Sequence, residues 1–216
     1  MGKSMLIIGL GNFGAHLASK LISLGNDVMV IDLEEKTVSE FQDKYNPSNS
    51  LFGDCTSESS IKKLGVKNFD VCFVTIGENL EASLQITSHL KKYGAKHIVC
   101  KAFSDLQTNL LGAAGADEVI NPEAEIANDL ARSYTYDNIF DYVEVSEGFA
   151  TAEIRPLKIW LGQSIIQVDI RKKYKVTIFA VKRADGVIIV PGPDYVFVKD
   201  DHLKIVGPLD AVKKFK

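Results

Sequence analysis

The stretch that decides the fold is residues 5–32, MLIIGLGNFGAHLASKLISLGNDVMVID. Residues 5–8 and 28–31 are short apolar runs, typical of strands that are buried on both faces of a parallel sheet. Between them, apolar residues recur at helical spacing over residues 15–24, and Gly25 follows as a helix-ending residue. The stretch therefore predicts a strand, a glycine loop, a helix and a second strand, which is the first unit of a doubly wound α/β sheet.

The glycines after the first predicted strand form the pattern G-x-G-x-x-G at Gly9, Gly11 and Gly14. Gly9 permits a tight turn, Gly11 lets a phosphate approach the backbone, and Gly14 lets the helix pack against the strand. The N-terminus of that helix attracts anions. Asp32 ends the second strand, where a carboxylate accepts hydrogen bonds from ribose hydroxyls and repels a 2′-phosphate. These features predict a site for an adenine nucleotide or dinucleotide; the alternative is that the glycines serve only a tight turn.

Composition limits the class of protein. The chain has 216 residues, of which 46% are hydrophobic and 25% charged, as expected of a globular protein with one large or two small domains. Its net charge of −3 gives no electrostatic footprint for nucleic acid. With no leader pattern and no apolar run near the length of a membrane span, we expect a soluble, cytoplasmic protein. Cys55, Cys72 and Cys100 are expected to be reduced core residues, with a redox switch as the alternative.

Further strands are predicted at residues 50–52, 71–76, 97–101 and 118–120, alternating with helices. In a doubly wound sheet the carboxyl ends of the strands line the ligand crevice. Asp54, Cys55, Glu78, Asn79 and Lys101 each follow or end such a strand, so they are candidate ligand contacts. Asp54 and Asn79 have the alternative of capping the helices that follow them, and Lys101 that of a solvated lysine.

The pattern changes from about residue 141, and we divide the chain into residues 1–135 and 136–216. The second part is expected to be a small α+β module with strands at residues 143–145, 152–154, 176–182, 187–190, 195–198 and 203–206. Residues 162–174 carry one helical turn pattern, and residues 211–215 a last short helix. So small a module buries a modest core, so pairing with a second copy would stabilise it. The helix at residues 123–134 has no sheet face left to cover and is a candidate for crossing to a partner subunit.

No catalytic constellation is recognisable in the sequence. The chain lacks a Tyr-x-x-x-Lys pair, a G-x-S-x-G elbow, an H-E-x-x-H motif and a Walker lysine. A nucleotide domain joined to a second domain without catalytic residues suggests ligand sensing without turnover. The alternatives are a small NAD(H)-dependent oxidoreductase or NAD(H)-sensing protein, and a redox-responsive module built on Cys55.

The order of these features resembles the KtrA/TrkA family of potassium-transport regulators, which pair an RCK N-terminal nucleotide domain with a small RCK C-terminal domain. The segments that carry the resemblance are IIGLGNFG, VID, GDCT, LGVKNFDVCFVTIGENLEAS, NPE and DIRKKYKVTIFAVKR. The resemblance implies a non-enzymatic subunit whose dimers assemble into an octameric ring. The ring would be peripheral on the inner face of the membrane, docked on a KtrB-like or TrkH-like subunit, with ATP favouring ion flow and ADP opposing it.

The resemblance also implies the residues of the sites. The nucleotide would contact Gly9, Gly11, Asn12, Phe13 and Gly14 with its phosphates, Asp32 with its ribose, Asp54 and Cys55 with its adenine, and Ile76, Gly77 and Glu78 at the closing wall of the pocket. Leu33, Lys36 and Asn79 are further expected contacts, and Lys101 would reach a terminal phosphate across subunits. Glu123 would hold Mg²⁺, Ca²⁺ or Na⁺ between subunits, with the alternative that it is a helix N-terminal acid favoured by the dipole.

Two positions depart from the family pattern. KtrA proteins commonly carry an arginine, whose charge meets the γ-phosphate, where this chain has Asn12. Loss of that cation weakens the expected discrimination of ATP from ADP and leaves NAD(H) or AMP open. In the second module, several family members bind cyclic di-AMP. The corresponding residues here are Ile170, Arg171, Val176, Thr177, Ile178 and Pro191. Thr177 replaces the usual asparagine, which leaves cyclic di-AMP binding open.

Overall fold

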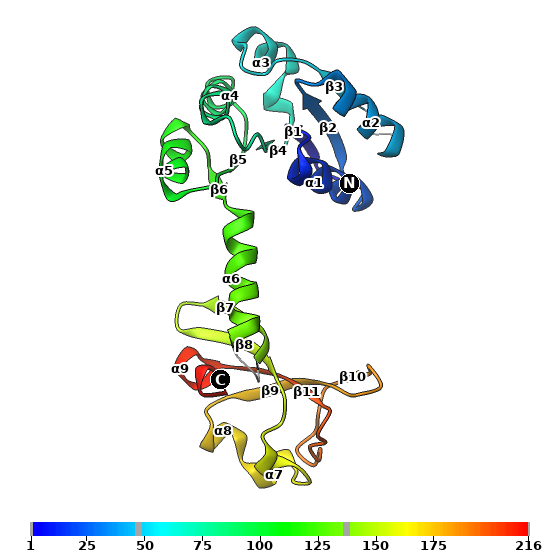
Figure 1. The fold of residues 1–216 in the computed structure, drawn as a ribbon, viewed down its shortest axis with the longest axis vertical. Helices are drawn as coiled ribbons and strands as arrows, with labels where there is room; N and C mark the ends of the chain where they lie inside the picture. Colours follow the sequence, from blue (N-terminus) through cyan, green and yellow to red (C-terminus); the bar gives the residue numbers. More distant parts are fainter. Residues whose placement is uncertain (1, 46–48, 136–138, 216) are drawn as a thin grey trace. The chain divides into compact units, whose positions relative to one another are not determined.

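The computed structural model describes residues 2–45, 49–135 and 139–215. The chain forms two compact units, Met1–Ala124 and Glu125–Lys216 (Figure 1). Among the described residues, no helix combines the length and the apolar character needed to cross a membrane.

The first unit contains a six-stranded sheet in the order β3-β2-β1-β4-β5-β6, and all of its strand pairs are parallel. Its strands are β1 (Ser4–Ile8), β2 (Asp27–Asp32), β3 (Asn49–Phe52), β4 (Val71–Val74), β5 (Ile98–Lys101) and β6 (Glu118–Ile120). This order confirms the predicted doubly wound sheet. The strand order reverses between β1 and β4, and a ligand site of such a sheet lies at that switch point.

Helices alternate with these strands in the chain (Figure 1). They are α1 (Asn12–Ser23), α2 (Glu35–Tyr45), α3 (Glu58–Leu64), the 3₁₀ turn η1 (Val66–Asn68), α4 (Leu80–Lys92), α5 (Asp105–Ala114) and α6 (Pro122–Thr135). Successive residues of β1 belong to two different apolar clusters: Leu6 and Ile8 pack in one, Met5 and Ile7 in the other. The central strand is therefore buried on both faces, as its continuous apolar sequence predicts.

The helix α6 runs from the first unit into the second along the chain. Its apolar residues Ile126, Leu130 and Tyr134 are 60%, 52% and 88% exposed in the single chain. These three apolar side chains are therefore largely open to solvent in the single chain.

The second unit contains a five-stranded antiparallel sheet in the order β10-β9-β11-β8-β7. Its strands are β7 (Ile139–Ser146), β8 (Phe149–Ile154), β9 (Thr177–Lys182), β10 (Ile188–Ile189) and β11 (His202–Pro208). Its helices are η2 (Lys158–Trp160), α7 (Ile165–Val168), α8 (Ile170–Lys173), α9 (Leu209–Val212) and η3 (Lys213–Phe215). The predicted α+β module is confirmed.

Two local predictions for the second unit were wrong. Residues 195–198 do not form a strand; they make one isolated bridge, between Ser164 and Val196. The N–H of Phe197 is donated to the Gln163 carbonyl across 3.0 Å, so this segment pairs with the loop before α7 and not with the sheet. Residues 162–174 form two short helices, because Asp169 between them has a left-handed backbone with φ of +51°.

The core of the second unit is built around Trp160, the only tryptophan of the chain, which is 1% exposed. Its indole N–H donates to the Tyr174 hydroxyl across 3.1 Å. Its ring lies 5.6 Å from that of Phe197 and 5.7 Å from that of Phe215, centroid to centroid. These aromatic contacts join η2, the end of α8, the segment before β11 and η3, which are far apart in the sequence.

Candidate nucleotide site

The glycine loop between β1 and α1 has the geometry expected of each of its glycines. Gly9 has a φ of +103°, which favours glycine in the turn that follows β1. A Cβ at Gly11 would meet no atom within 4 Å, so the backbone there is open to an approaching group. A Cβ at Gly14 would lie 2.0 Å from the Gly9 carbonyl oxygen, so only glycine allows α1 to pack this closely.

Thr75, the residue after β4, holds the glycine loop in place through hydrogen bonds. Its buried hydroxyl lies 2.6 Å from the carbonyl oxygen of Gly9 and 3.1 Å from that of Ile8. It thereby ties the carboxyl ends of β1 and β4 together at the switch point. Sequence reasoning did not single out Thr75, because a threonine after an apolar strand carries no motif.

Asp32 joins the end of β2 to the same loop. Its Oδ2 accepts a hydrogen bond from the Leu10 N–H across 2.6 Å, and its Oδ1 accepts one from the Glu34 N–H across 2.9 Å. A carboxylate offers about four lone-pair positions, so the half-buried Asp32 retains acceptor capacity toward the cavity. The side chain can orient the loop and accept from a ribose hydroxyl at the same time.

A cavity of about 650 Å³ lies at this end of the sheet. The predicted residues that line it are Gly9, Gly11, Asp32, Leu33, Asp54, Cys55, Ile76, Gly77, Glu78 and Asn79. Others that line it but were not predicted include Leu10, Thr37, Thr75 and Ile86. This volume falls in the range of small-molecule sites, and its wall combines apolar side chains with a few oriented polar groups.

Two polar residues of the wall also have local structural roles. Asp54 accepts from the backbone N–H of Thr56 at 2.8 Å and from its hydroxyl at 2.7 Å, and these bonds hold the pKa of Asp54 below its usual value. Asn79 is the N-cap of α4, because its Oδ1 accepts from the Ala82 N–H across 3.0 Å. The capping alternative is thus confirmed for Asn79, while both residues still face the cavity.

Cys55 is a wall residue without the character of a reactive thiol. It is 5% exposed, and burial, followed by the nearby charges of Asp54 and Asp32, raises its pKa to about 12. Burial likewise raises the pKa of Cys72 to about 12 and that of Cys100 to about 11. Thiolate, the nucleophilic form, is therefore disfavoured at all three positions.

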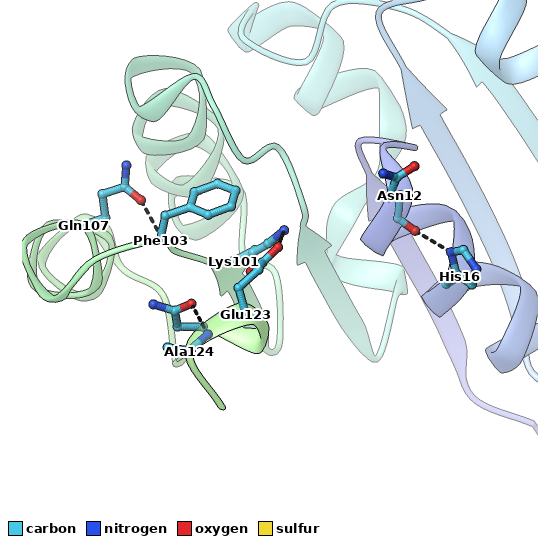
Figure 2. Close-up of polar contacts among 8 residues, drawn as sticks. Asn12, His16, Lys101, Phe103, Gln107, Glu123 and Ala124 are labelled. Carbon is cyan, nitrogen blue, oxygen red and sulfur yellow. Dashed lines mark hydrogen bonds and ion pairs between the residues drawn. The ribbon is translucent and has the colours of Figure 1, made fainter. Parts of the chain in front are cut away.

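Lys101, the last residue of β5, lies beside Glu123 in the same chain (Figure 2). Its side chain is 8% exposed, and its ammonium donates to Glu123 Oε1 across 2.5 Å. The ammonium also lies 4.4 Å from the ring centroid of Phe103 and 5.4 Å from that of Phe13, in the first turn of α1. The hydrogen bond from Lys101 lowers the pKa of Glu123. A buried cation thus lies next to the predicted phosphate-binding helix turn.

Asn12, Phe13, Gly14, Lys36 and Lys101 are the predicted nucleotide contacts that do not line the cavity. Asn12 starts α1, and its carbonyl accepts from Nδ1 of His16 at 2.7 Å (Figure 2). Lys36 is on the surface of α2, with its ammonium 3.7 Å from Glu40 Oε1. Contact between Lys36 and the nucleotide therefore remains a prediction, and this geometry does not favour it.

Glu123 does not have the surroundings of a metal ligand within one chain. In the described part of the chain, no group of three His, Cys, Asp or Glu side chains could hold a metal ion. Mg²⁺ and Ca²⁺ need several oxygen ligands, whereas this carboxylate accepts a hydrogen bond from the Lys101 ammonium. Among the described residues of one chain, no cluster of acidic, His or Cys side chains completes a cation site at Glu123.

A second cavity, of about 370 Å³, lies in the second unit. Four residues predicted for cyclic di-AMP line it: Ile170, Arg171, Ile178 and Pro191. Val176 does not, because it is buried in the core of the unit, and neither does Thr177, the first residue of β9. The remaining lining residues were not predicted; they are Ile165, Ile166, Asp169, Gly192 and Pro193.

Comparisons with known proteins match both parts of the chain. Residues 5–122 match the model of the TrkA-N domain, and residues 149–216 match that of the TrkA-C domain. The Ktr system potassium uptake protein C of Bacillus subtilis is 36% identical over 216 residues, which is all of this chain and 97% of that protein. The Ktr system potassium uptake protein A of the same organism is 29% identical, covering 99% of this chain and 96% of that protein.

Among solved structures, the GsuK RCK domain superposes on 99% of this chain and 46% of its own, with a TM-score of 0.69 and 17% identity. At that identity, the likeness establishes the fold of the chain. It agrees with the order of a parallel six-stranded sheet followed by a small antiparallel one.

Proposed function

The chain belongs to the KtrA/TrkA family, and from this premise we propose that it is a nucleotide-binding regulatory subunit of a potassium uptake system of the Ktr or Trk type. The observation that carries the proposal is the cavity at the β1–β4 switch point, bounded by the glycine loop and by Asp32. Its Bacillus subtilis relatives are potassium uptake proteins, which supports potassium uptake as the process and favours this role over the small oxidoreductase.

We propose binding without turnover. Three polar groups that the cavity offers, those of Asp32, Asp54 and Asn79, each accept a backbone hydrogen bond that holds them in place. Such groups orient a ligand well but are poorly suited to pass protons to it. The thiol of Cys55 is equally unsuited, because its raised pKa keeps it protonated.

The proposed nucleotide contacts follow the geometry of the cavity. Gly11 and the first turn of α1 receive the phosphates, and Asp32 accepts from the ribose. The wall at Asp54 and Cys55 contacts the adenine. Lys101 supplies a cation for the phosphates from the same chain. This cation offsets the loss of the arginine that KtrA proteins commonly carry where this chain has Asn12. ATP and ADP are the first candidates, with AMP and NAD(H) as further ones.

The proposed assembly is a ring of identical subunits, octameric by family resemblance, on the cytoplasmic face of a KtrB-like or TrkH-like membrane subunit. The exposed Ile126, Leu130 and Tyr134 of α6 support contact with a second copy, because apolar side chains of this size are seldom left uncovered together. We retain the division into a nucleotide domain at residues 1–135 and a regulatory domain at residues 136–216. In such a ring Glu123 would bind a cation only if a second copy supplied further oxygen ligands.

The cavity of the second unit is proposed as a separate regulatory site for cyclic di-AMP. Arg171 offers a cation to its phosphates, and Ile170, Ile178 and Pro191 offer an apolar wall to its bases. Thr177, in place of the usual asparagine, is expected to weaken this binding.

Calorimetric titration of the full chain with ATP, ADP, AMP, NADH and cyclic di-AMP tests the proposal. We expect at least one adenine nucleotide to bind below the millimolar range, light scattering to detect a large oligomer, and chromatography to recover the nucleotide unchanged. Hydride transfer to a substrate would establish the oxidoreductase instead. Absence of any binding below the millimolar range would refute the nucleotide-gated role.

A further inference from the structure

Phe103 is placed between the cavity wall and a buried cation, and nothing in the nucleotide-binding pattern points to it. It follows β5 by two residues, and its backbone N–H donates to Gln107 Oε1 across 2.8 Å (Figure 2). The residue is 42% exposed, so its position does not come from burial in the main core. An exposed aromatic ring with defined neighbours needs a local explanation.

The first neighbour of the ring is Gly77, which lines the nucleotide cavity. A Cβ at Gly77 would lie 2.3 Å from Cζ of Phe103 and 2.4 Å from its Cε2, far inside van der Waals contact. The ring therefore occupies the space that any other residue at position 77 would fill. The backbone of Gly77 does not have a positive φ, so conformational freedom is not the reason for a glycine here.

The second neighbour is the Lys101 ammonium, 4.4 Å from the ring centroid. A cation over the face of an aromatic ring is attracted by the ring quadrupole, most strongly where water is excluded. Lys101 is 8% exposed, and its hydrogen-bond acceptor Glu123 is the second residue of α6. The ring of Phe103 thus contacts the cavity wall on one side and the Lys101–Glu123 ion pair on the other.

We propose that Phe103 couples occupancy of the nucleotide cavity to the Lys101–Glu123 ion pair at the start of α6. The inference rests on the proposed function, because it takes the cavity to be the nucleotide site. A ligand that shifts the backbone at Gly77 must shift the ring, since there is no room between them. Displacement of the ring removes one of the groups that hold the Lys101 ammonium. Lys101 then exchanges its Glu123 partner for a ligand phosphate, and the first turn of α6 loses its side-chain tie to β5.

Phe103 is on this account a positioning residue, which acts through Lys101. A coupling of this kind requires an element with two states. Here that element is the side chain of Phe103, which is either packed on Gly77 or turned away from it. Because coupling between two binding events is reciprocal, loss of the ring must change both nucleotide affinity and the response of α6.

The test uses hydrogen exchange of the full chain, followed by mass spectrometry of the peptide that covers residues 121–130, with and without saturating ATP. In the wild-type protein we expect ATP to speed exchange of this peptide at least about fivefold, the lower end of typical coupling. In Phe103→Ala and Phe103→Leu the response is expected to fall below about twofold while ATP still binds. Leu106→Ala, an exposed residue of α5 outside the cavity, serves as the matched control and keeps the wild-type response. A full wild-type response in both Phe103 variants overturns the proposal.

A second variant, which displaces the ring of Phe103 by steric clash, tests the same coupling without ligand. Gly77→Ala places a methyl group where the ring lies, so the ring must turn away and exchange at residues 121–130 must rise without ATP. The double variant Gly77→Ala, Phe103→Ala is compared with the single variant Phe103→Ala. Adding the methyl group at position 77 must then cause no further rise in exchange, because the three atoms nearest to the new Cβ all belong to Phe103. A rise that persists in the double variant shows a route that bypasses the ring and overturns the proposal. If no nucleotide binds the wild-type protein, the proposed function fails, and the ligand-free comparison still tests this coupling.

Discussion

The carboxylate of Asp32 accepts a hydrogen bond from the backbone N–H of Leu10 across 2.6 Å. The bond crosses from the end of β2 to the glycine loop after β1, so an acid in the expected ribose position also sets the course of the loop. Its other oxygen accepts from the Glu34 N–H, which fixes the orientation of the carboxylate. The structural role and the proposed ligand role therefore belong to one side chain and need a variant that separates them.

Asp32→Asn is that variant. The amide oxygen of asparagine can still accept from Leu10, but its NH2 group cannot accept from the Glu34 N–H, so we expect the free energy of unfolding to fall by about 1–2 kcal/mol. The charged acceptor for the ribose is lost, and hydrogen bonds to charged groups contribute about 1.5–3 kcal/mol, so nucleotide affinity is expected to fall at least about tenfold. Calorimetry and urea denaturation measure the two quantities. Unchanged affinity would remove Asp32 from the site.

Gly14→Ala and Gly11→Ala separate packing from ligand approach. At Gly14 the new Cβ would lie 2.0 Å from the Gly9 carbonyl oxygen and 2.6 Å from the Thr75 hydroxyl, so we expect a loss of about 1–3 kcal/mol in the free energy of unfolding. At Gly11 the new Cβ meets nothing within 4 Å, so stability is expected to stay the same while nucleotide affinity falls. Urea denaturation with parallel titrations checks both. Equal stability of the two variants would contradict the packing role of Gly14.

Lys101→Met tests the intrachain cation. Methionine keeps much of the side-chain length and removes the charge, so affinity for ATP should fall by about tenfold, in line with a charge-assisted hydrogen bond to phosphate. Affinity for adenosine, which has no phosphate, should not change. Lys62→Met, at an exposed lysine of α3, is the control for the loss of one positive charge. A similar loss for adenosine would point to a general disturbance of the pocket.

The cysteines offer a test of the redox alternative through their rates of alkylation in the folded and unfolded chain. Burial raises the pKa of Cys55 from 9.0 to about 12, so the fold favours the neutral thiol. At pH 8 about one Cys55 in 10⁴ is then thiolate in the folded chain, against about one in ten when unfolded. We expect iodoacetamide to label Cys55, Cys72 and Cys100 only on unfolding, at a rate that follows denaturant. Fast labelling of Cys55 in the native protein would revive the redox switch.

Arg171→Gln tests the second cavity. The substitution removes the charge proposed to meet phosphate, and cyclic di-AMP affinity is expected to fall at least about tenfold. Lys172→Gln, the neighbouring residue of α8 that does not line the cavity, makes the same charge change and is the control. Equal effects of the two variants would indicate general electrostatic attraction without a defined site.

The first unit could be predicted from the sequence because its signals are local. A buried parallel strand, a glycine at a tight turn and an acid at a strand end each follow from a few adjacent residues, and their order sets the sheet topology. The position of Asp32 and of the loop at the switch point followed from this order. The cavity residues after β3 and β4 followed from the rule that ligands bind at carboxyl strand ends.

What could not be predicted depends on contacts between distant segments. Phe103 is an aromatic residue in a loop, and only its approach to Gly77 and Lys101 gives it significance. Residues 195–198 have the composition of a strand, but the carbonyl of Gln163 takes the hydrogen bond that a sheet neighbour would otherwise accept. The pairing of Glu123 with Lys101 within one chain was missed for the same reason.

The lone tryptophan provides an intrinsic fluorescence probe of one unit. Trp160 lies in the second unit and is surrounded by aromatic side chains, while the first unit contains no tryptophan. Intrinsic fluorescence excited at the red edge of indole absorption therefore records the state of the second unit alone. Far-ultraviolet circular dichroism records both units. If the two units unfold separately, the two signals will have different midpoints, so the cooperativity between the first and the second unit can be measured without any label.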